Sequence, residues 1–132
     1  MKKQFLTFVL VAVATLFSSN ISFAQSKEQK VTIIDLSQTT NEFNVKGLQL
    51  KPGKYQFKVT NVDVNKELGF VIQKASDKNM DVMKTAVENS FTTALIKKGD
   101  TQLTGVVELK EGEYFYSCPL NPTPHYTINV KK

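Results

Sequence analysis

The chain has 132 residues, with 17 basic side chains that are all lysine, 12 acidic ones, one histidine and one cysteine. Lysines and acids are interspersed instead of forming a basic stripe, and no arginine is available for bidentate phosphate contacts, so nucleic-acid binding is not expected. A single cysteine cannot form an internal disulfide. The fold therefore depends on its hydrophobic core, and the thiol is either an inert buried group or a reactive or metal-binding one.

The first residues have the features of a secretory signal peptide. Lys2 and Lys3 precede an apolar run over residues 5–17, and residues 22–24 are of the type that a signal peptidase needs. The run is shorter than the roughly 20 residues that span a bilayer, which makes a retained membrane anchor the weaker alternative. We therefore expect cleavage after residue 24, a single domain over residues 25–132 with no membrane span, and a periplasmic or secreted location.

Short runs of alternating or β-branched residues, separated by turns at spacings near ten residues, extend through most of this domain. Tyr55, Phe57 and Val59 alternate with polar residues and should share one buried face. Pro52 followed by Gly53 predicts a type II turn with a positive φ at the glycine. The expected strands are residues 30–36, 43–46, 48–50, 55–60, 67–73, 101–109 and the two arms of a hairpin around residues 118–125, while 91–96 fits a strand or a helix end.

Residues 77–89 depart from the strand pattern, because Met80, Met83 and Val87 recur at helical spacing. Asp77 is a suitable N-cap for such a helix, and the two methionines would lie on its apolar face. Together these patterns predict an all-β Greek-key sandwich or barrel of about seven or eight strands, with one short helical insertion.

The C-terminal hairpin carries the residues with the most chemistry. Cys118 and His125 lie at the two ends of its loop, and Pro119, Pro122 and Pro124 restrict the backbone between them. A loop of this stiffness either preorganises a metal ligand, presents a contact surface to a partner, or only shapes the end of the hairpin.

Several runs together resemble the cupredoxins, the blue-copper protein fold, over most of residues 31–131. They are Leu50-Lys-Pro-Gly-Lys-Tyr, Glu67-Leu-Gly-Phe-Val-Ile, and Gly105-Val-Val-Glu-Leu-Lys-Glu-Gly-Glu-Tyr-Phe-Tyr-Ser-Cys118-Pro. The resemblance implies a copper ion held by a cysteine at the end of the penultimate strand, a histidine from the following loop and a second histidine from the earlier strand, with a weak axial ligand. Cys118 matches the thiolate position, and His125 matches the loop histidine or the axial position. Glu67 lies where the second histidine is expected.

Two hypotheses follow from this incomplete match. In the first, Cys118, His125 and Glu67 bind copper, with Met80 or Met83 completing a soft ligand set that favours copper(I). Electron transfer or copper handling would then be the role, with a redox or copper-donor protein docking at the 119–125 loop. In the second, the chain is a metal-free sandwich that serves as a binding or structural module, with a buried thiol, an exposed histidine and methionines that belong to the core.

Enzymatic activity is not predicted. A nucleophilic cysteine-histidine pair needs an orienting third group and a cleft, and neither is visible around a proline-rich hairpin loop. Serines and carboxylates show no catalytic spacing, and the sequence has no glycine-rich phosphate loop.

Overall fold

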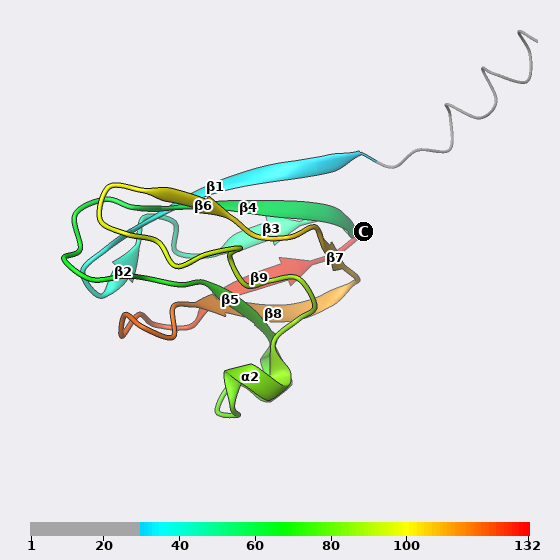
Figure 1. The fold of residues 1–132 in the computed structure, drawn as a ribbon. Coiled ribbons are helices and arrows are strands. Elements are labelled where there is room, and N and C mark those ends of the chain that lie inside the picture. Colours follow the sequence, from blue (N-terminus) through cyan, green and yellow to red (C-terminus); the bar gives the residue numbers. More distant parts are fainter. Residues whose placement is uncertain (1–29) are drawn as a thin grey trace, which may run out of the picture. The chain divides into compact units, whose positions relative to one another are not determined.

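Residues 30–132 are the part of the chain that the computed structural model describes, and the predicted leader at residues 1–24 lies outside it. Strands in this part form two sheets (Figure 1). The strands are β1 (Val31–Thr39), β2 (Glu42–Phe43), β3 (Leu48–Leu50), β4 (Gly53–Asn61), β5 (Val71–Lys74), β6 (Thr101–Leu103), β7 (Val107–Leu109), β8 (Gly112–Ser117) and β9 (Tyr126–Val130). Two short helical segments, η1 (Ala75–Asp77) and α2 (Val82–Thr85), lie between β5 and β6. Among residues 30–132, no helix is both long and apolar enough to cross a bilayer.

The first sheet has the strand order β2-β1-β4-β6, with β7 pairing with the start of β4, and the second has the order β3-β9-β8-β5. β1 runs parallel to β4 and β3 runs parallel to β9. The chain passes back and forth between the sheets, so neighbouring strands come from distant parts of the sequence, as in Greek-key folds. The all-β sandwich that the sequence predicts is confirmed, with nine strands in the described residues.

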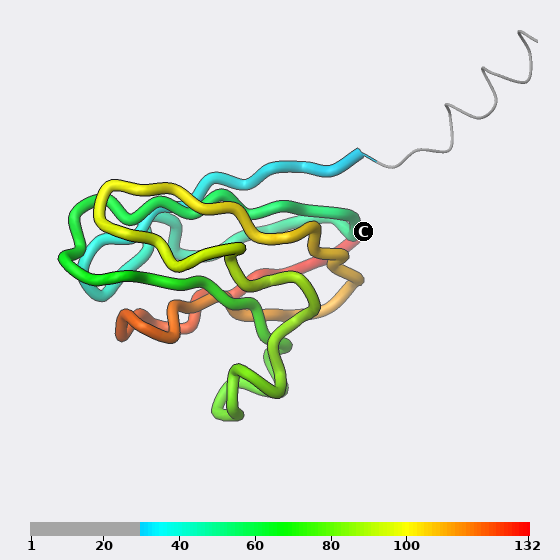
Figure 2. Tube along the Cα trace, in the orientation of Figure 1, coloured from blue at the N-terminus to red at the C-terminus, as the bar shows by residue number. Residues whose placement is uncertain are grey.

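Three loops gather at one end of this sandwich. Figure 2 shows the turn between β1 and β2, the connection from β4 to β5 and the loop between β8 and β9 at the same end. A hydrogen bond from the Asn41 amide to the Asn121 side chain, at 3.0 Å, joins the first of these loops to the last. Residues that are some 80 positions apart in sequence are therefore neighbours here.

The core lies between the sheets and is rich in aromatic side chains. Tyr55, Phe57 and Val59 of β4 are all buried, which confirms the shared face that their alternation predicts. Phe57 stacks on Phe70 with ring centroids 5.4 Å apart, and other core rings meet edge to face. Pairs of this kind contribute about 0.5–1.5 kcal/mol each beyond the burial of their area, so the aromatic centre ties the two sheets together.

The helix predicted over residues 77–89 is largely wrong. Its only α-helical turn is α2, which is capped by the Asp81 side chain accepting a hydrogen bond from the Met83 amide, whereas Asp77 belongs to η1. Met80 is 58% exposed and Met83 is 76% exposed. Helices in proteins are stabilised mainly by packing an apolar face, and these side chains do not provide one, so the helix stops after a single turn.

Some predicted strands are shorter than expected or interrupted. In the segment 67–73 only residues 71–73 belong to a strand, β5, and Leu68 makes an isolated bridge to Ile96 instead. The run 101–109 is split into β6 and β7, because the Phe57 amide donates to the Thr104 hydroxyl at 3.0 Å in place of a backbone carbonyl. Residues 91–96 form neither helix nor strand and make only isolated bridges.

The first strand and the predicted turn also differ from expectation. β1 continues to Thr39, beyond the predicted end at residue 36, because Gln38 and Thr39 pair with β2. β2 is correspondingly short and ends at Phe43. Gly53 is not among the glycines with a positive φ and instead begins β4, so the type II turn is wrong.

Tyr116 offers a test of this core. Its hydroxyl donates to the Val45 carbonyl, and burial raises the pKa of Tyr116 to about 12. Replacing Tyr116 with Phe should cost about 1 kcal/mol at neutral pH through the lost hydrogen bond. Because an unfolded tyrosine ionises near pH 10, the folded wild-type protein should lose further stability as the pH rises from about 10 to 12, and the variant should lose less.

Urea unfolding at neutral pH and at about pH 11 measures both effects. Tyr114→Phe is the matched control, because it removes a hydroxyl bond to the Lys110 carbonyl at 3.0 Å from the same strand. An alkaline decline that is as steep in Tyr116→Phe as in the wild type would show that Tyr116 is not its source.

Candidate functional site

Cys118 directly follows β8 and is held at both its thiol and its backbone. Its side chain belongs to the hydrophobic core and is 6% exposed. The Gly69 amide donates to the Cys118 Sγ at 3.3 Å, and the Cys118 amide donates to the Thr123 Oγ1 at 3.1 Å. The thiol therefore lies in the core of the sandwich, and the loop turns back so that Thr123 contacts the Cys118 backbone.

His125 lies on the other side of the second sheet. Its ring packs edge-on against Phe115, with centroids 5.8 Å apart, and the Lys78 ammonium lies 5.5 Å from the same phenyl ring. Phe115 alternates along β8 with Tyr114 and Tyr116, which face the core, so Phe115 and the imidazole on it occupy the outer face. Partial burial and, to a smaller extent, the charge of Lys78 lower the pKa of His125.

Glu67 is exposed in the connection from β4 to β5. The next residue, Leu68, is fully buried, and its backbone exchanges two hydrogen bonds with Ile96, at 3.0 and 2.8 Å. Among residues 30–132, no group of three histidine, cysteine or acidic side chains is close enough to hold a metal ion. The structure therefore does not bring Cys118, His125 and Glu67 together as one such group.

A buried pair of amides fixes the loop instead. The Asn121 side chain donates to the Gln38 Oε1 at 3.2 Å and to the Thr39 carbonyl at 3.1 Å, while it accepts from the Asn41 amide. The Gln38 side chain in turn donates to the Gly69 carbonyl at 2.8 Å. Sequence reasoning missed both side chains, since a glutamine and an asparagine 83 positions apart carry no local signal of their contact.

An apolar groove of about 370 Å³ opens beside this loop. Gly69 and Phe70 are its buried residues, whereas most of the other large apolar side chains around it are exposed to solvent. Three separate segments form its walls: α2, the irregular stretch 91–95, and the start of the 119–125 loop. The lining residues are Gly69, Phe70, Val82, Met83, Phe91, Thr92, Ala94, Leu95, Pro119 and Leu120.

The metal-free hypothesis placed Met80 and Met83 in the core. Both are exposed, so they are not ordinary core residues. Met83 lines the groove together with Gly69 and Pro119, which are respectively the hydrogen-bond partner and the chain neighbour of Cys118. The sequence did not predict that Met83 lines a groove, because the helical spacing of Met80 and Met83 indicated a buried face.

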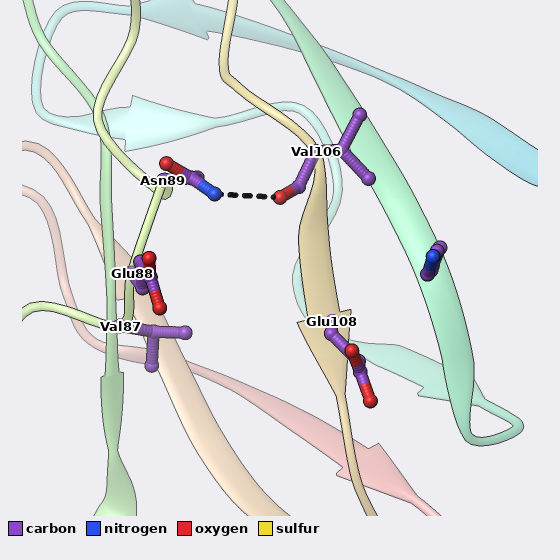
Figure 3. A pocket seen from close by; sticks show the side chains of 6 residues that line it. Val87, Glu88, Asn89, Val106 and Glu108 are labelled. Atoms are coloured by element: carbon purple, nitrogen blue, oxygen red, sulfur yellow. Dashed lines mark hydrogen bonds between the residues drawn. The ribbon is translucent and has the colours of Figure 1, made fainter.

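A second, more polar hollow of about 280 Å³ lies between the chain around Val87 and β7 (Figure 3). In it the Asn89 side chain donates to the Val106 carbonyl at 3.1 Å. Glu88 and Glu108 approach from separate segments. Gly105 is required beside it, because a Cβ there would lie 2.9 Å from the Asn89 Cβ. The arrangement closes the edge of β7 and shows no convergent set of ligand groups.

Comparison with known proteins identifies the fold. No protein-family model matches the chain, and no curated protein matches it in sequence. Auracyanin A, a "blue" copper protein from the green thermophilic photosynthetic bacterium Chloroflexus aurantiacus, matches with a TM-score of 0.62 and 12% identity, over 77% of this chain and 100% of that one. Auracyanin B matches with a TM-score of 0.57 and 13% identity, over 80% of this chain and 92% of that one. The chain therefore has the cupredoxin-like fold that its sequence resembles.

The amide pair predicts a large effect from a single substitution. Asn121→Ala removes three hydrogen bonds and leaves buried partners on β1 unsatisfied, so we expect a loss of about 2–4 kcal/mol. The free energy of urea unfolding measures this loss. Asn44→Ala is the control, because it removes one exposed amide contact, to the Ser37 amide, and should cost less than about 1 kcal/mol. Equal losses in the two variants would contradict a special role for Asn121.

Proposed function

We propose that this protein is an exported, non-enzymatic binding module of cupredoxin-like fold, which engages a protein partner through the apolar groove beside the 119–125 loop. The observation that carries the proposal is the gathering of exposed apolar side chains from three separate segments around one groove. Clusters of this kind mark interaction sites, because single exposed apolar residues are common but contiguous ones are not. The signal-peptide features of residues 1–24 support export, with residues 25–132 as the mature domain and a periplasmic or secreted location.

The lining of the groove indicates the chemistry of the partner. Its lining is apolar apart from Thr92 and backbone groups, so recognition rests on shape and apolar contact. Its volume is near the lower limit for small-molecule sites and suits one or two large apolar side chains of a protein segment. Met83 adds a flexible wall that adapts to the shape of such side chains.

The charged residues around the groove indicate which residues should flank the apolar side chains of the partner. Lys84 follows Met83 directly, and Lys97 and Lys98 follow the lining stretch 91–95, all of them exposed. Residues 25–132, the mature domain in this proposal, hold 15 lysines and 12 acidic residues and so carry a net charge of +3. We therefore expect a partner segment that presents apolar side chains flanked by acidic residues, since opposite charges at the rim guide association and orientation.

Copper handling is the second candidate, and one observation favours it. Met83 lines the same groove as Gly69, whose amide donates to the Cys118 thiol, and Pro119, which follows Cys118 in the chain. Thiolate and thioether ligands favour copper(I). Electron transfer at a two-histidine copper site has less support, because His125 lies on the outer face and Glu67, at the position expected for a second histidine, is exposed.

Copper titration of the purified protein separates the two candidates. If binding is the function, we expect no intense thiolate-to-copper absorption band with copper(II) and no stoichiometric uptake of copper(I) from a competing chelator. Cys118 should resist alkylation in the folded protein with or without copper, because it is a core side chain, and should react rapidly in urea. A stoichiometric band or uptake that disappears in Cys118→Ser would restore the copper hypothesis.

Peptide selection tests the groove directly. Peptides selected from a random display library on the purified protein should be rich in apolar residues flanked by acids. Leu95→Lys and Leu120→Lys should each weaken the selected peptides about tenfold or more, because a charge replaces an apolar wall. Val62→Lys is the matched control, since Val62 and Leu95 are both 49% exposed and Val62 does not line the groove. Equal weakening by all three variants would overturn the assignment.

A further inference from the structure

Most sheet edges in the described residues are covered or short. The Val87 amide donates to the Ile72 carbonyl of β5 at 2.8 Å, and the Thr93 amide donates to the Leu103 carbonyl of β6 at 2.9 Å. The Asn89 side chain occupies the Val106 carbonyl at the start of β7 (Figure 3). β3 has only three residues. Covering or shortening an edge prevents it from pairing with another chain.

β1 is the exception. It pairs with β4 from Val31 to Gln38, but on its other side only Gln38 and Thr39 pair with β2. Within residues 30–132, no strand lies beside residues 31–36 on that outer side, and Figure 1 shows this half of β1 running along the border of the sheet. A long edge of main-chain donors and acceptors is therefore open.

The direction of these backbone groups follows from the residues next to them. The Ser37 amide donates to the Asn44 side chain and the Ser37 carbonyl accepts from the Asn44 amide, so both groups of Ser37 point away from β4. The Gln38 carbonyl accepts from the Val62 amide and points the opposite way. Because backbone groups alternate along a strand, the amide and carbonyl groups of the odd-numbered residues before Ser37 also point to the open edge of β1. These residues are Val31, Ile33 and Asp35.

One apolar side chain on this edge of β1 is unusually exposed to solvent. Ile33 is 56% exposed, the largest exposure of any apolar residue in the strands. Its register partner on β4 is Gln56, and the next outward position of β1, Asp35, lies beside Lys58. The outer face around Ile33 is thus polar, and Ile33 occupies the middle of the three open backbone positions.

We propose that a second copy of this chain pairs with β1 in antiparallel orientation, with Ile33 on the two-fold axis. In this register Ile33 lies opposite Ile33 of the second copy, and Val31 lies opposite Asp35. All three positions then become hydrogen-bonded pairs, in which the facing residues exchange both their N–H···O bonds. The two isoleucines meet on the outer face and cover each other. The edge is therefore complementary to itself, which is the requirement for a two-fold interface.

The register also avoids electrostatic conflict, because Asp35 faces a valine and not its own copy. One strand per copy buries less surface than a standard interface, so the dimer should be weak and concentration-dependent. This inference is independent of the proposed function, since none of the groove residues belongs to β1.

Sedimentation velocity from micromolar to millimolar concentration tests the dimer, with protein purified after expression of the full chain. The wild type should shift toward the sedimentation coefficient of a dimer. Ile33→Lys should remain monomeric, because it sets two like charges opposite each other. Ile33→Pro should also remain monomeric, since it removes an amide that points to the open edge and not to β4.

Leu103→Lys is the control, because it makes the same change on an exposed residue of β6 in the same sheet, and it should dimerise like the wild type. Circular dichroism and thermal unfolding at low concentration should show that all the variants fold. A wild type that stays monomeric throughout would overturn the proposal. A dimer that persists in both Ile33 variants would do so as well, because it would have to use another surface.

Discussion

The end of the sandwich that carries the loop after β8 depends on the buried contact between the side chains of Gln38 and Asn121. Asn121 fixes the loop after β8 to the end of β1, and Gln38 carries the constraint on to the carbonyl of Gly69. The amide of Gly69 then meets the thiol of Cys118. Both amides are buried, where an unpaired polar group is costly, so few other arrangements of the three segments would satisfy them. This chain of contacts places Pro119 and Leu120 beside Phe70 and so creates one wall of the groove.

The same contacts show how this cupredoxin-like fold is held together at the end that carries the β8–β9 loop. The end of the sandwich is held by amide hydrogen bonds and by buried Leu68, so its integrity rests on groups that the chain supplies itself. His125 is directed away from Cys118 because strand alternation places it with Phe115 on the outer face. At this position the fold carries a loop held by buried amide hydrogen bonds, beside an apolar groove.

Sequence alone was sufficient for the parts of the fold that depend on local periodicity. The alternation of Tyr55, Phe57 and Val59 identified β4 and its buried face, and the resemblance identified the fold. Prediction from the sequence failed where contacts between distant residues determine the structure. Gln38 and Asn121 look like ordinary surface amides until the topology brings them together. Residues 77–89 showed helical spacing, but spacing predicts a helix only if its apolar side has a surface to pack against, and Met80 and Met83 have none.

The irregular stretch from residue 86 to 100 shows how one segment serves two purposes. Its backbone and the side chain of Asn89 satisfy the edges of β5, β6 and β7, so these groups are not free to form a continuous strand of their own. With its main chain turned toward those edges, it leaves Phe91 and Leu95 facing solvent, where they line the groove. β1 lies on the opposite side of the first sheet from β6, beyond β4, and receives no such cover. The path of this segment therefore covers the edges of β5, β6 and β7 but does not reach the edge of β1, and it leaves the apolar groove open to solvent.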